Sequence, residues 1–274
     1  MSDQRLAEPI SPFGAVTAVE RIGPTVHRTQ GAWSENVHRL LDHVRRRGFT
    51  GAPRFLGVDE RGREILDFID GTTADDVPSD NVLASAAVLL RRFHDATADG
   101  ALLELTGWQL PTGDPVEVVC HNDVAPYNCV VRDGVAVGLI DFDVAAPGPR
   151  AWDLAYALYR FVPLSQDVGD AEVQGERAGR FLAAYGASRD DATEAIRLVP
   201  VRLQALVDFM EARAASGDTA YAGHIARGDA EQYRRDIRSL SRNSPKIALS
   251  GSFCVSFSTV NGLGLGRPGQ GSCG

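Results

Sequence analysis

Lysine is nearly absent from this chain of 274 residues. Of its 28 basic residues only Lys246 is a lysine, and all the others are arginines. Because alanine and glycine are abundant as well, we interpret this bias as the mark of a GC-rich genome. It has one chemical consequence. Lysine is excluded from any catalytic or phosphate-binding role before residue 246, so an arginine would have to fill such a role.

Cysteine and long apolar runs are also scarce. The four cysteines form neither a close metal-ligand pair nor a disulfide pattern: Cys120, Cys129, Cys254 and Cys273. No apolar run reaches the ~18 residues that a membrane-spanning helix needs. The first residues, MSDQRLAEPISPFG, lack the charged-then-apolar pattern of a signal peptide. These absences favour a cytoplasmic protein with no membrane partner.

The chain carries no excess of positive charge. It has 36 acidic against 28 basic residues and a net charge of -8, which argues against a nucleic-acid partner. An acidic cleft would attract a cationic ligand, although solubility alone is the simpler explanation of the charge. The apolar fraction of 44% and the charged fraction of 23% are ordinary for a globular protein.

Strand signals dominate the first third of the sequence. Residues 15–28 predict two short strands with a turn at Gly23-Pro24, and residues 53–71 predict a hairpin with Gly62 in its turn. A helix is expected between them over residues 34–47, with Ser34 as its N-cap.

Helical periodicity dominates the rest. Residues 81–97 form a strong amphipathic pattern, and residues 151–242 are almost wholly helical in pattern. A strand at 116–120 and a strand segment at 129–140 interrupt them. This arrangement predicts a two-lobed α+β protein, with a small N-terminal sheet lobe, a larger mainly helical lobe and a boundary near Gly71.

The last segment, residues 243–274, differs from what precedes it. It has no Asp or Glu, is rich in Gly and Ser, and contains two of the four cysteines. We expect a flexible tail there, and its composition suggests an extension unrelated to the main fold.

The densest polar stretch is VCHNDVAPYNCVVRDGVAVGLIDFD, which begins at residue 119. Taken singly, an Asp or Asn between strands is usually a turn residue. Taken together, Asp123, Asn128 and Asp141 supply what phosphoryl transfer from a nucleotide needs. One acid would orient the attacking hydroxyl, and hard oxygen ligands would hold magnesium.

Three motifs in this region resemble those of the aminoglycoside phosphotransferase family, small-molecule kinases with a protein-kinase-like fold. The family's H-x-D-x-x-x-x-N loop matches residues 121–128, and its I-D-x-D/E metal motif matches residues 140–143. Its W-D-L-A segment matches residues 152–155. Weaker matches extend the resemblance to roughly residues 15–240, and the order and spacing of the three motifs make it specific.

The resemblance implies roles for these residues. Asp123 would be the catalytic base, while Asn128 and Asp141 would bind Mg²⁺. Asp143 would support the metal or the substrate. His121 and Asp153 would be structural, bracing the loops by hydrogen bonds.

The resemblance also implies a site for ATP or GTP. Residues 1–71 would form the nucleotide-binding lobe and residues 72–242 the catalytic and substrate lobe. The hinge around Phe68 and Ile69 would offer backbone groups to the base of the nucleotide.

The N-terminal lobe departs from the family pattern. Kinases of this type place a lysine on the nucleotide phosphates and pair it with an acid in the next helix. Here Arg28 is the best substitute for the lysine. Glu35 and Asp42 lie on the helix face opposite the apolar stripe, so we expect both to point to water and predict no Arg-acid pair. A Gly-rich loop of the form G-x-G-x-x-G is also missing.

Two functions remain open. The first is a kinase of a small hydroxylated molecule, with an aminoglycoside or another cationic antibiotic as acceptor. Asp208 and Glu211 would then be acids able to meet a cation, although a solvated helix face explains them more simply. The second is a non-catalytic protein that binds or sequesters a small molecule or toxin. A metal-dependent hydrolase has little support, since no His-rich ligand set accompanies the acids.

Overall fold

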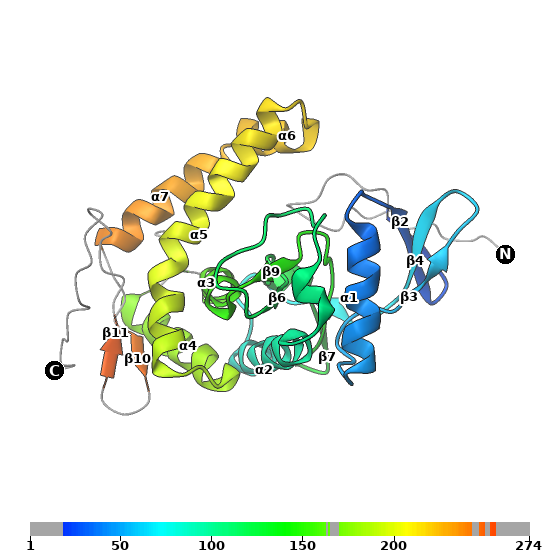
Figure 1. Ribbon diagram of the computed structural model, residues 1–274. Helices are drawn as coiled ribbons and strands as arrows, with labels where there is room; N and C mark the ends of the chain where they lie inside the picture. Colours follow the sequence, from blue (N-terminus) through cyan, green and yellow to red (C-terminus); the bar gives the residue numbers. More distant parts are fainter. Residues whose placement is uncertain (1–18, 163, 165–169, 243–246, 250–252, 256–274) are drawn as a thin grey trace. The chain divides into compact units, whose positions relative to one another are not determined.

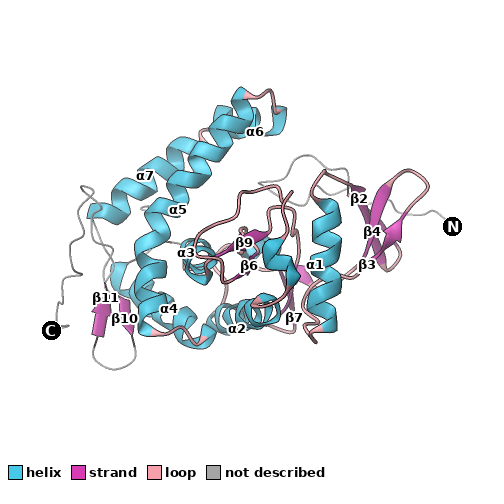
Figure 2. Ribbon diagram, in the orientation of Figure 1, coloured by secondary structure: helices cyan, strands magenta, loops and turns pink. Residues whose placement is uncertain are grey.

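The computed structural model describes residues 19–162, 164, 170–242, 247–249 and 253–255. The chain divides into two compact units. The first comprises Met1–Asp75 with Leu89–Arg150, and the second Asp76–Val88 with Ala151–Gly274. Antiparallel strands prevail in the N-terminal region and helices in the C-terminal part (Figures 1 and 2), which confirms the predicted α+β class. The lobe boundary near Gly71 stays a prediction.

A four-stranded antiparallel sheet opens the first unit. Its strands are β1 (Glu20–Ile22), β2 (Thr25–Thr29), β3 (Phe55–Val58) and β4 (Arg63–Asp67), in the order β1-β2-β4-β3. The two predicted hairpins are therefore correct. Gly23 and Gly62 take positive φ values of 60° and 75° in their turns, a conformation that glycine adopts without strain.

Helix α1 (Ser34–Arg46) follows β2. Its apolar stripe is buried, with Leu40 and Val44 at 0% exposure. The predicted N-cap is wrong. Trp33 is the N-cap and already has helical dihedral angles, so Ser34 lies inside the first turn. The hydroxyl of Ser34 instead accepts a hydrogen bond from the backbone N–H of Gly31 at 2.9 Å.

Two smaller sheets complete the first unit. One joins β5 (Thr72–Thr73), β7 (Cys129–Arg132) and β8 (Val135–Leu139), and the other pairs β6 (Val118–Cys120) with β9 (Ala146–Gly148). The strand segment expected over residues 129–140 forms the hairpin β7-β8. Strands β5 and β9 were not expected, because strands of two or three residues carry too few positions to show alternation.

Aromatic packing fixes the loops beside these sheets. Phe93 lies in helix α2 (Asp80–Thr97), and its ring centroid is 5.4 Å from that of Phe142. The ring of Phe142 is in turn 4.5 Å from the ring of His121. All three side chains have at most 1% exposure, so the loop before β7 and the loop after β8 share one buried core.

The second unit consists mainly of helices. They are α3 (Arg150–Phe161), α4 (Ala171–Tyr185), α5 (Arg189–Ala215), α6 (Thr219–Arg227) and α7 (Asp229–Arg242). Helix α5 packs against α6 and α7. Inside the unit, the fully buried Asp236 accepts a hydrogen bond of 2.8 Å from the hydroxyl of Tyr159.

Within the predicted tail, β10 (Ile247–Leu249) pairs with β11 (Phe253–Val255), and β10 packs near α4. The other tail residues, for which flexibility was expected, lie outside the described residues. None of the helices in the described part of the chain is both long and apolar enough to cross a membrane.

Candidate active site

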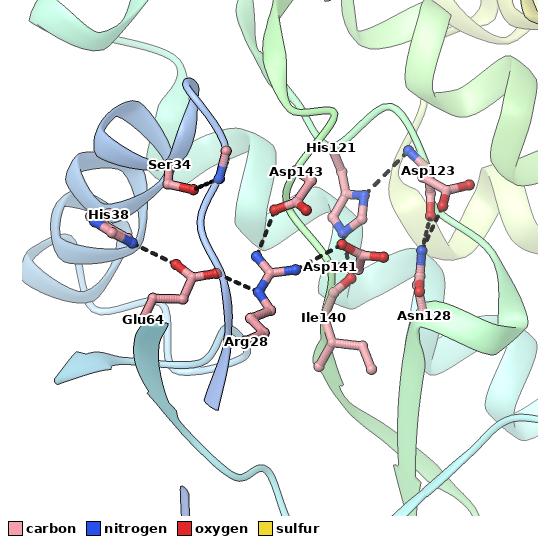
Figure 3. Close-up of polar contacts among 11 residues, drawn as sticks. Arg28, Ser34, His38, Glu64, His121, Asp123, Asn128, Ile140, Asp141 and Asp143 are labelled. Carbon is pink, nitrogen blue, oxygen red and sulfur yellow. Dashed lines mark hydrogen bonds and ion pairs between the residues drawn. The ribbon is translucent and has the colours of Figure 1, made fainter. Parts of the chain in front are cut away.

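The predicted catalytic loop lies between β6 and β7, where the chain leaves one small sheet and enters the other. Asp123 is 8% exposed, and its two carboxylate oxygens have different partners. Oδ1 accepts a hydrogen bond from the Tyr127 hydroxyl at 2.7 Å, and Oδ2 accepts one from the Asn128 amide at 2.8 Å. A second bond of 3.0 Å joins that amide to the Asp123 carbonyl oxygen, so the Asn128 side chain has one fixed orientation (Figure 3).

The oxygen of the Asn128 amide group differs from its nitrogen. Its Oδ1 atom is buried and has no hydrogen-bond partner in the described structure. A buried acceptor without a partner is costly, and a hard oxygen in this state suits Mg²⁺. Among the described residues no group of three or more His, Cys, Asp or Glu side chains gathers as a metal cluster. The buried Oδ1 of Asn128 and the carboxylate of Asp141 are candidate ligands for such a cation.

Hydrogen bonds to the backbone brace the two loops. His121 Nε2 lies 3.0 Å from the carbonyl oxygen of Ile140, and its Nδ1 accepts the N–H of Asp123 at 3.2 Å. The pairing assigns the proton to Nε2, because Nδ1 must be the acceptor. His121 therefore has the hydrogen bonds that its expected bracing role requires.

Two residues of these loops adopt the left-handed backbone region. Asn122 and Asp141 both have φ of 65°, which is uncommon outside glycine although Asn and Asp tolerate it best. Asn122 is held there by a 3.0 Å hydrogen bond from its side chain to the Val144 carbonyl oxygen. Such strain persists where the surroundings enforce it, and it is concentrated at functional sites.

Arg28, the fourth of the five residues of β2, points its guanidinium group at three acids (Figure 3). Its Nε donates to Glu64, its Nη1 lies 3.2 Å from Asp141 Oδ1, and its Nη2 lies 2.6 Å from Asp143 Oδ1. The structure therefore joins the sheet residue proposed for phosphate binding to the loop acid proposed for metal binding.

Burial and charge act against each other in this cluster. Burial opposes the charge of Arg28, but Asp143, Asp141 and Glu64 raise its pKa above the ordinary value. Burial also opposes ionisation of Glu64, yet a hydrogen bond with His38 and the charge of Arg28 lower its pKa. For Asp143 burial prevails over the charge of Arg28, and with the repulsion of Asp141 it raises the pKa to about 6.

The prediction that Arg28 has no acid partner is wrong. The partner comes from the neighbouring strand β4 instead of the helix, since Arg28 and Glu64 are directly opposite each other in the β2-β4 register. Glu35 and Asp42 do point to water, as expected. Their side chains are 76% and 62% exposed, and each pairs with an arginine on its own helix.

The predicted nucleotide hinge follows β4. The N–H of Phe68 donates a 2.8 Å hydrogen bond to the Pro24 carbonyl oxygen, so this donor is used within the unit. The guanidinium carbon of Arg21 lies 3.6 Å from the centre of the Phe68 ring. Base binding by the backbone of Phe68 and Ile69 remains a prediction.

The remaining predicted residues belong to the second unit. Asp153 is fully buried in α3. Asp208 accepts a hydrogen bond of 2.8 Å from Gln204, and Glu211 forms an ion pair of 2.7 Å with Arg234. Both acids on α5 thus have partners on helix surfaces, as a solvated face predicts.

Sequence reasoning missed three polar residues of the site: Glu64, His38 and Tyr127. Glu64 had a recognisable signal. It lies two residues before Leu66, so both side chains are on the buried face of the strand, and a charged residue on such a face is unusual. Tyr127 lies within the matched loop, but the motif leaves its position unspecified. His38 had no such signal.

The fold and these loops define a class: a protein-kinase-like α+β protein with an aspartate-asparagine loop and a following acidic loop. Comparison with known proteins agrees. The model of the phosphotransferase enzyme family matches residues 98–199. The trifolitoxin immunity protein of Rhizobium leguminosarum bv. trifolii is 36% identical over 190 residues, covering 64% of this chain and 73% of that protein. The chain therefore belongs to this family, the aminoglycoside phosphotransferase family that its motifs resemble.

Solved structures of the family share the fold at low sequence identity. An aminoglycoside phosphotransferase from Alicyclobacillus acidocaldarius superposes with a TM-score of 0.54 at 18% identity, covering 86% of this chain and 91% of that one. The GDP complex of an aminoglycoside 2'-phosphotransferase has a TM-score of 0.51 at 13% identity, with coverage of 81% and 89%. At such identities the likeness concerns the fold alone.

Proposed function

We propose that the protein transfers the γ-phosphoryl group of ATP or GTP to a hydroxyl group of a small molecule. Asp123 would orient that hydroxyl and accept its proton. Asn128 and Asp141 would hold Mg²⁺, and Arg28 would bind phosphate oxygens. The backbone near Phe68 and Ile69 would hold the base.

The observation that carries this proposal is the double use of Asn128. Its amide nitrogen fixes Asp123 through two hydrogen bonds, while its Oδ1 is buried and has no hydrogen-bond partner among the described residues. One side chain thus couples the orientation of a base to an oxygen suited to a cation. When bound, Mg²⁺ would neutralise charge on the phosphates.

Asp123 is already in contact with a hydroxyl group. Tyr127 donates to its Oδ1 at 2.7 Å, which is the geometry that an acceptor hydroxyl would need for deprotonation. We infer that the acceptor hydroxyl takes the place of the Tyr127 hydroxyl on this oxygen. The tyrosine would then turn aside when the acceptor binds.

The family and one relative support a proposal for the class of acceptor. The relative is by name an immunity protein against trifolitoxin. We infer that the acceptor is an antibiotic or toxin with a free hydroxyl group, and cationic aminoglycosides are the first compounds to screen. The net charge of -8 favours association with a cation.

The test is calorimetric titration with ATP and with GTP, each with and without Mg²⁺, on the wild type and on Asp141→Asn. We expect binding of one nucleotide that depends on Mg²⁺ and is lost in the variant. A screen of antibiotics for phosphorylation would follow, read by mass spectrometry as addition of one phosphoryl group. No nucleotide binding under any condition would refute the proposal.

A second candidate is a non-catalytic protein that sequesters a toxin or antibiotic. It is favoured by the ion pairs of Arg28, which already supply Asp141 and Asp143 with a cation. In this case neither nucleotide would bind the wild type, while the toxin or antibiotic would bind without being modified.

A further inference from the structure

Glu64 is an unusual acid in the four-stranded sheet, because it is almost completely buried and pairs with the buried Arg28. Its side chain is 1% exposed, although it carries a carboxylate in the interior of β4. Its two oxygens have separate partners. One accepts the Nε–H of Arg28, and the other lies 2.5 Å from Nε2 of His38 (Figure 3).

His38 is itself held in place. Its ring stacks on the ring of Phe55 with a centroid distance of 3.6 Å and an interplanar angle of 10°. The strand β3 thus fixes the histidine of α1, and the histidine fixes one oxygen of Glu64. Because His38 binds one oxygen of Glu64, the other oxygen accepts the hydrogen bond from the guanidinium group of Arg28.

Arg28 is one cation shared by three carboxylates. The side chains of Asp141 and Asp143 are 24% and 25% exposed, whereas Glu64 is almost completely buried. Charge interactions with the two aspartates are weakened by solvent more than the interaction with Glu64. The guanidinium group can therefore leave the aspartates at lower cost than it can leave Glu64.

We propose that Glu64 is a positioning residue that holds Arg28 by its Nε, so that the two Nη groups are exchangeable between Asp141 and Asp143 and the phosphates of a nucleotide. His38 orients Glu64 for this task. Without nucleotide, Arg28 acts as an internal counter-ion that competes with a divalent cation for Asp141. With nucleotide bound, the two Nη groups of Arg28 turn to phosphate oxygens, whose spacing matches the fork of N–H donors on a guanidinium group.

This inference rests on the proposed function, because it takes Asp141 as a metal ligand and nucleotide phosphates as the second partner of Arg28. It goes further by assigning roles to Glu64 and His38 and by predicting competition that does not depend on catalysis. It is testable without a nucleotide or an acceptor.

The experiment measures Mn²⁺ binding in the absence of nucleotide by the electron paramagnetic resonance signal of free Mn²⁺. The proteins are the wild type, Arg28→Gln, Glu64→Gln, the double variant Arg28→Gln/Glu64→Gln and Asp141→Asn. We expect Arg28→Gln to bind Mn²⁺ about tenfold more tightly, because one competing charge is removed. Glu64→Gln should bind about threefold more weakly, because Arg28 then rests more fully on the aspartates.

The double variant separates this mechanism from a general change of electric field. If Glu64 acts through Arg28, the Glu64→Gln change has no further effect once Arg28 is absent. Additive effects in the cycle would overturn the proposal. The variant also removes both charges of the buried pair, which guards against misfolding caused by one unpaired charge.

Arg28→Lys and His38→Phe are further tests. An ammonium group keeps the charge but cannot span three carboxylates, so Arg28→Lys should bind Mn²⁺ more tightly than the wild type. An unchanged affinity would contradict the role of the fork. His38→Phe retains a ring for the stack on Phe55, and it should weaken Mn²⁺ binding in the same direction as Glu64→Gln but less.

The Asp141→Asn control distinguishes the two possible failures. Binding in the wild type that is lost in Asp141→Asn, without tightening in Arg28→Gln, would refute the counter-ion role and leave the metal site intact. No binding in any protein, Arg28→Gln included, would refute both. Circular dichroism and thermal unfolding of each variant establish that the comparison is made between folded proteins.

Discussion

The predicted catalytic loop between β6 and β7 and the Arg28 cluster (Arg28, Glu64, Asp141 and Asp143) are both buried or partly buried and polar, but they are held in different ways. In the loop between β6 and β7, the side chains that brace the main chain bind to backbone groups: His121 to Ile140 and Asn122 to Val144. The Asp123 carboxylate accepts its hydrogen bonds from two side chains of the same loop. In the cluster, the contacts of Arg28 and Glu64 are ion pairs and hydrogen bonds between side chains. A side chain tied to the backbone has one position, whereas a shared ion pair can redistribute without any change of the main chain. The loop is thus suited to fix geometry, and the cluster is suited to exchange charge.

The largest expected effect concerns the fixed loop. Asp123→Ala removes the proposed base, and we expect turnover to fall by about three orders of magnitude. Nucleotide affinity should remain unchanged, since no phosphate contact is assigned to this carboxylate. Steady-state kinetics and calorimetry measure the two quantities. Asp75→Ala, an exposed acid of the same unit, is the matched control. Unchanged turnover in Asp123→Ala would remove this residue from the base role.

A second change loosens the same loop without touching the base. His121→Phe keeps an aromatic ring beside Phe142 but leaves the Ile140 carbonyl and the Asp123 N–H without their buried partner. We expect a loss of about 3 kcal/mol in the free energy of unfolding. Urea denaturation measures it. A loss under about 1 kcal/mol would mean that water replaces these two hydrogen bonds. The loop would then be less rigid than its proposed role of fixing geometry requires.

The Arg28 cluster should contribute less to the free energy of unfolding than the hydrogen bonds of His121, but more than an ion pair on the surface. Glu64→Ala leaves Arg28 with two of its three acids, so we expect a loss of about 2 kcal/mol, below the usual cost of breaking a buried pair. The control is Glu35→Ala, whose pair with Arg39 is exposed and should contribute less than about 0.5 kcal/mol. Equal losses in the two variants would show that burial gives the Glu64 pair no special strength.

The smallest effect isolates backbone strain in the loop. Asn122→Gly and Asn122→Ala both delete the hydrogen bond to Val144, but only alanine is strained at a φ of 65°. The alanine variant should therefore be less stable than the glycine variant by about 1 kcal/mol. Thermal or urea unfolding of the pair measures the difference. Equal stability would indicate that the loop relaxes out of the left-handed region.

The sequence predicts the loop better than the cluster for a physical reason. Asp123 and Asn128 are five residues apart, so their spacing fixes their contact once the flanking strands are recognised. Arg28 and Glu64 are separated by 36 residues, and their contact depends on the register between two strands. In kinases of this type the acid that pairs with the phosphate-binding lysine comes from the next helix, so Glu35 and Asp42 were considered as partners of Arg28. The acid that pairs with Arg28 is Glu64, which lies on the neighbouring strand of the sheet.

Local rules also failed at one helix end. Ser34 has the residue type of an N-cap, but the chain turns into the helix one residue earlier, at Trp33. Residue preference alone does not locate this boundary, because the Ser34 hydroxyl accepts a hydrogen bond from the N–H of Gly31 and not from an N–H of the helix. The apolar stripe expected along this helix is nevertheless buried, since it depends on the helical period and not on the position of the N-cap.

The presence of arginine at position 28 has a consequence for chemical probing of the proposed nucleotide site. Lysine-directed reagents, such as nucleotides that carry an amine-reactive acyl group, need a nucleophilic amine beside the phosphates. The neighbouring acids raise the pKa of Arg28, so its guanidinium group stays protonated and inert to such reagents. Dicarbonyl compounds condense with arginine only in its deprotonated form, so the raised pKa and the burial of Arg28 should make this labelling slow and favour alkaline pH. Protection of Arg28 from them by a nucleotide would report occupancy of the site directly.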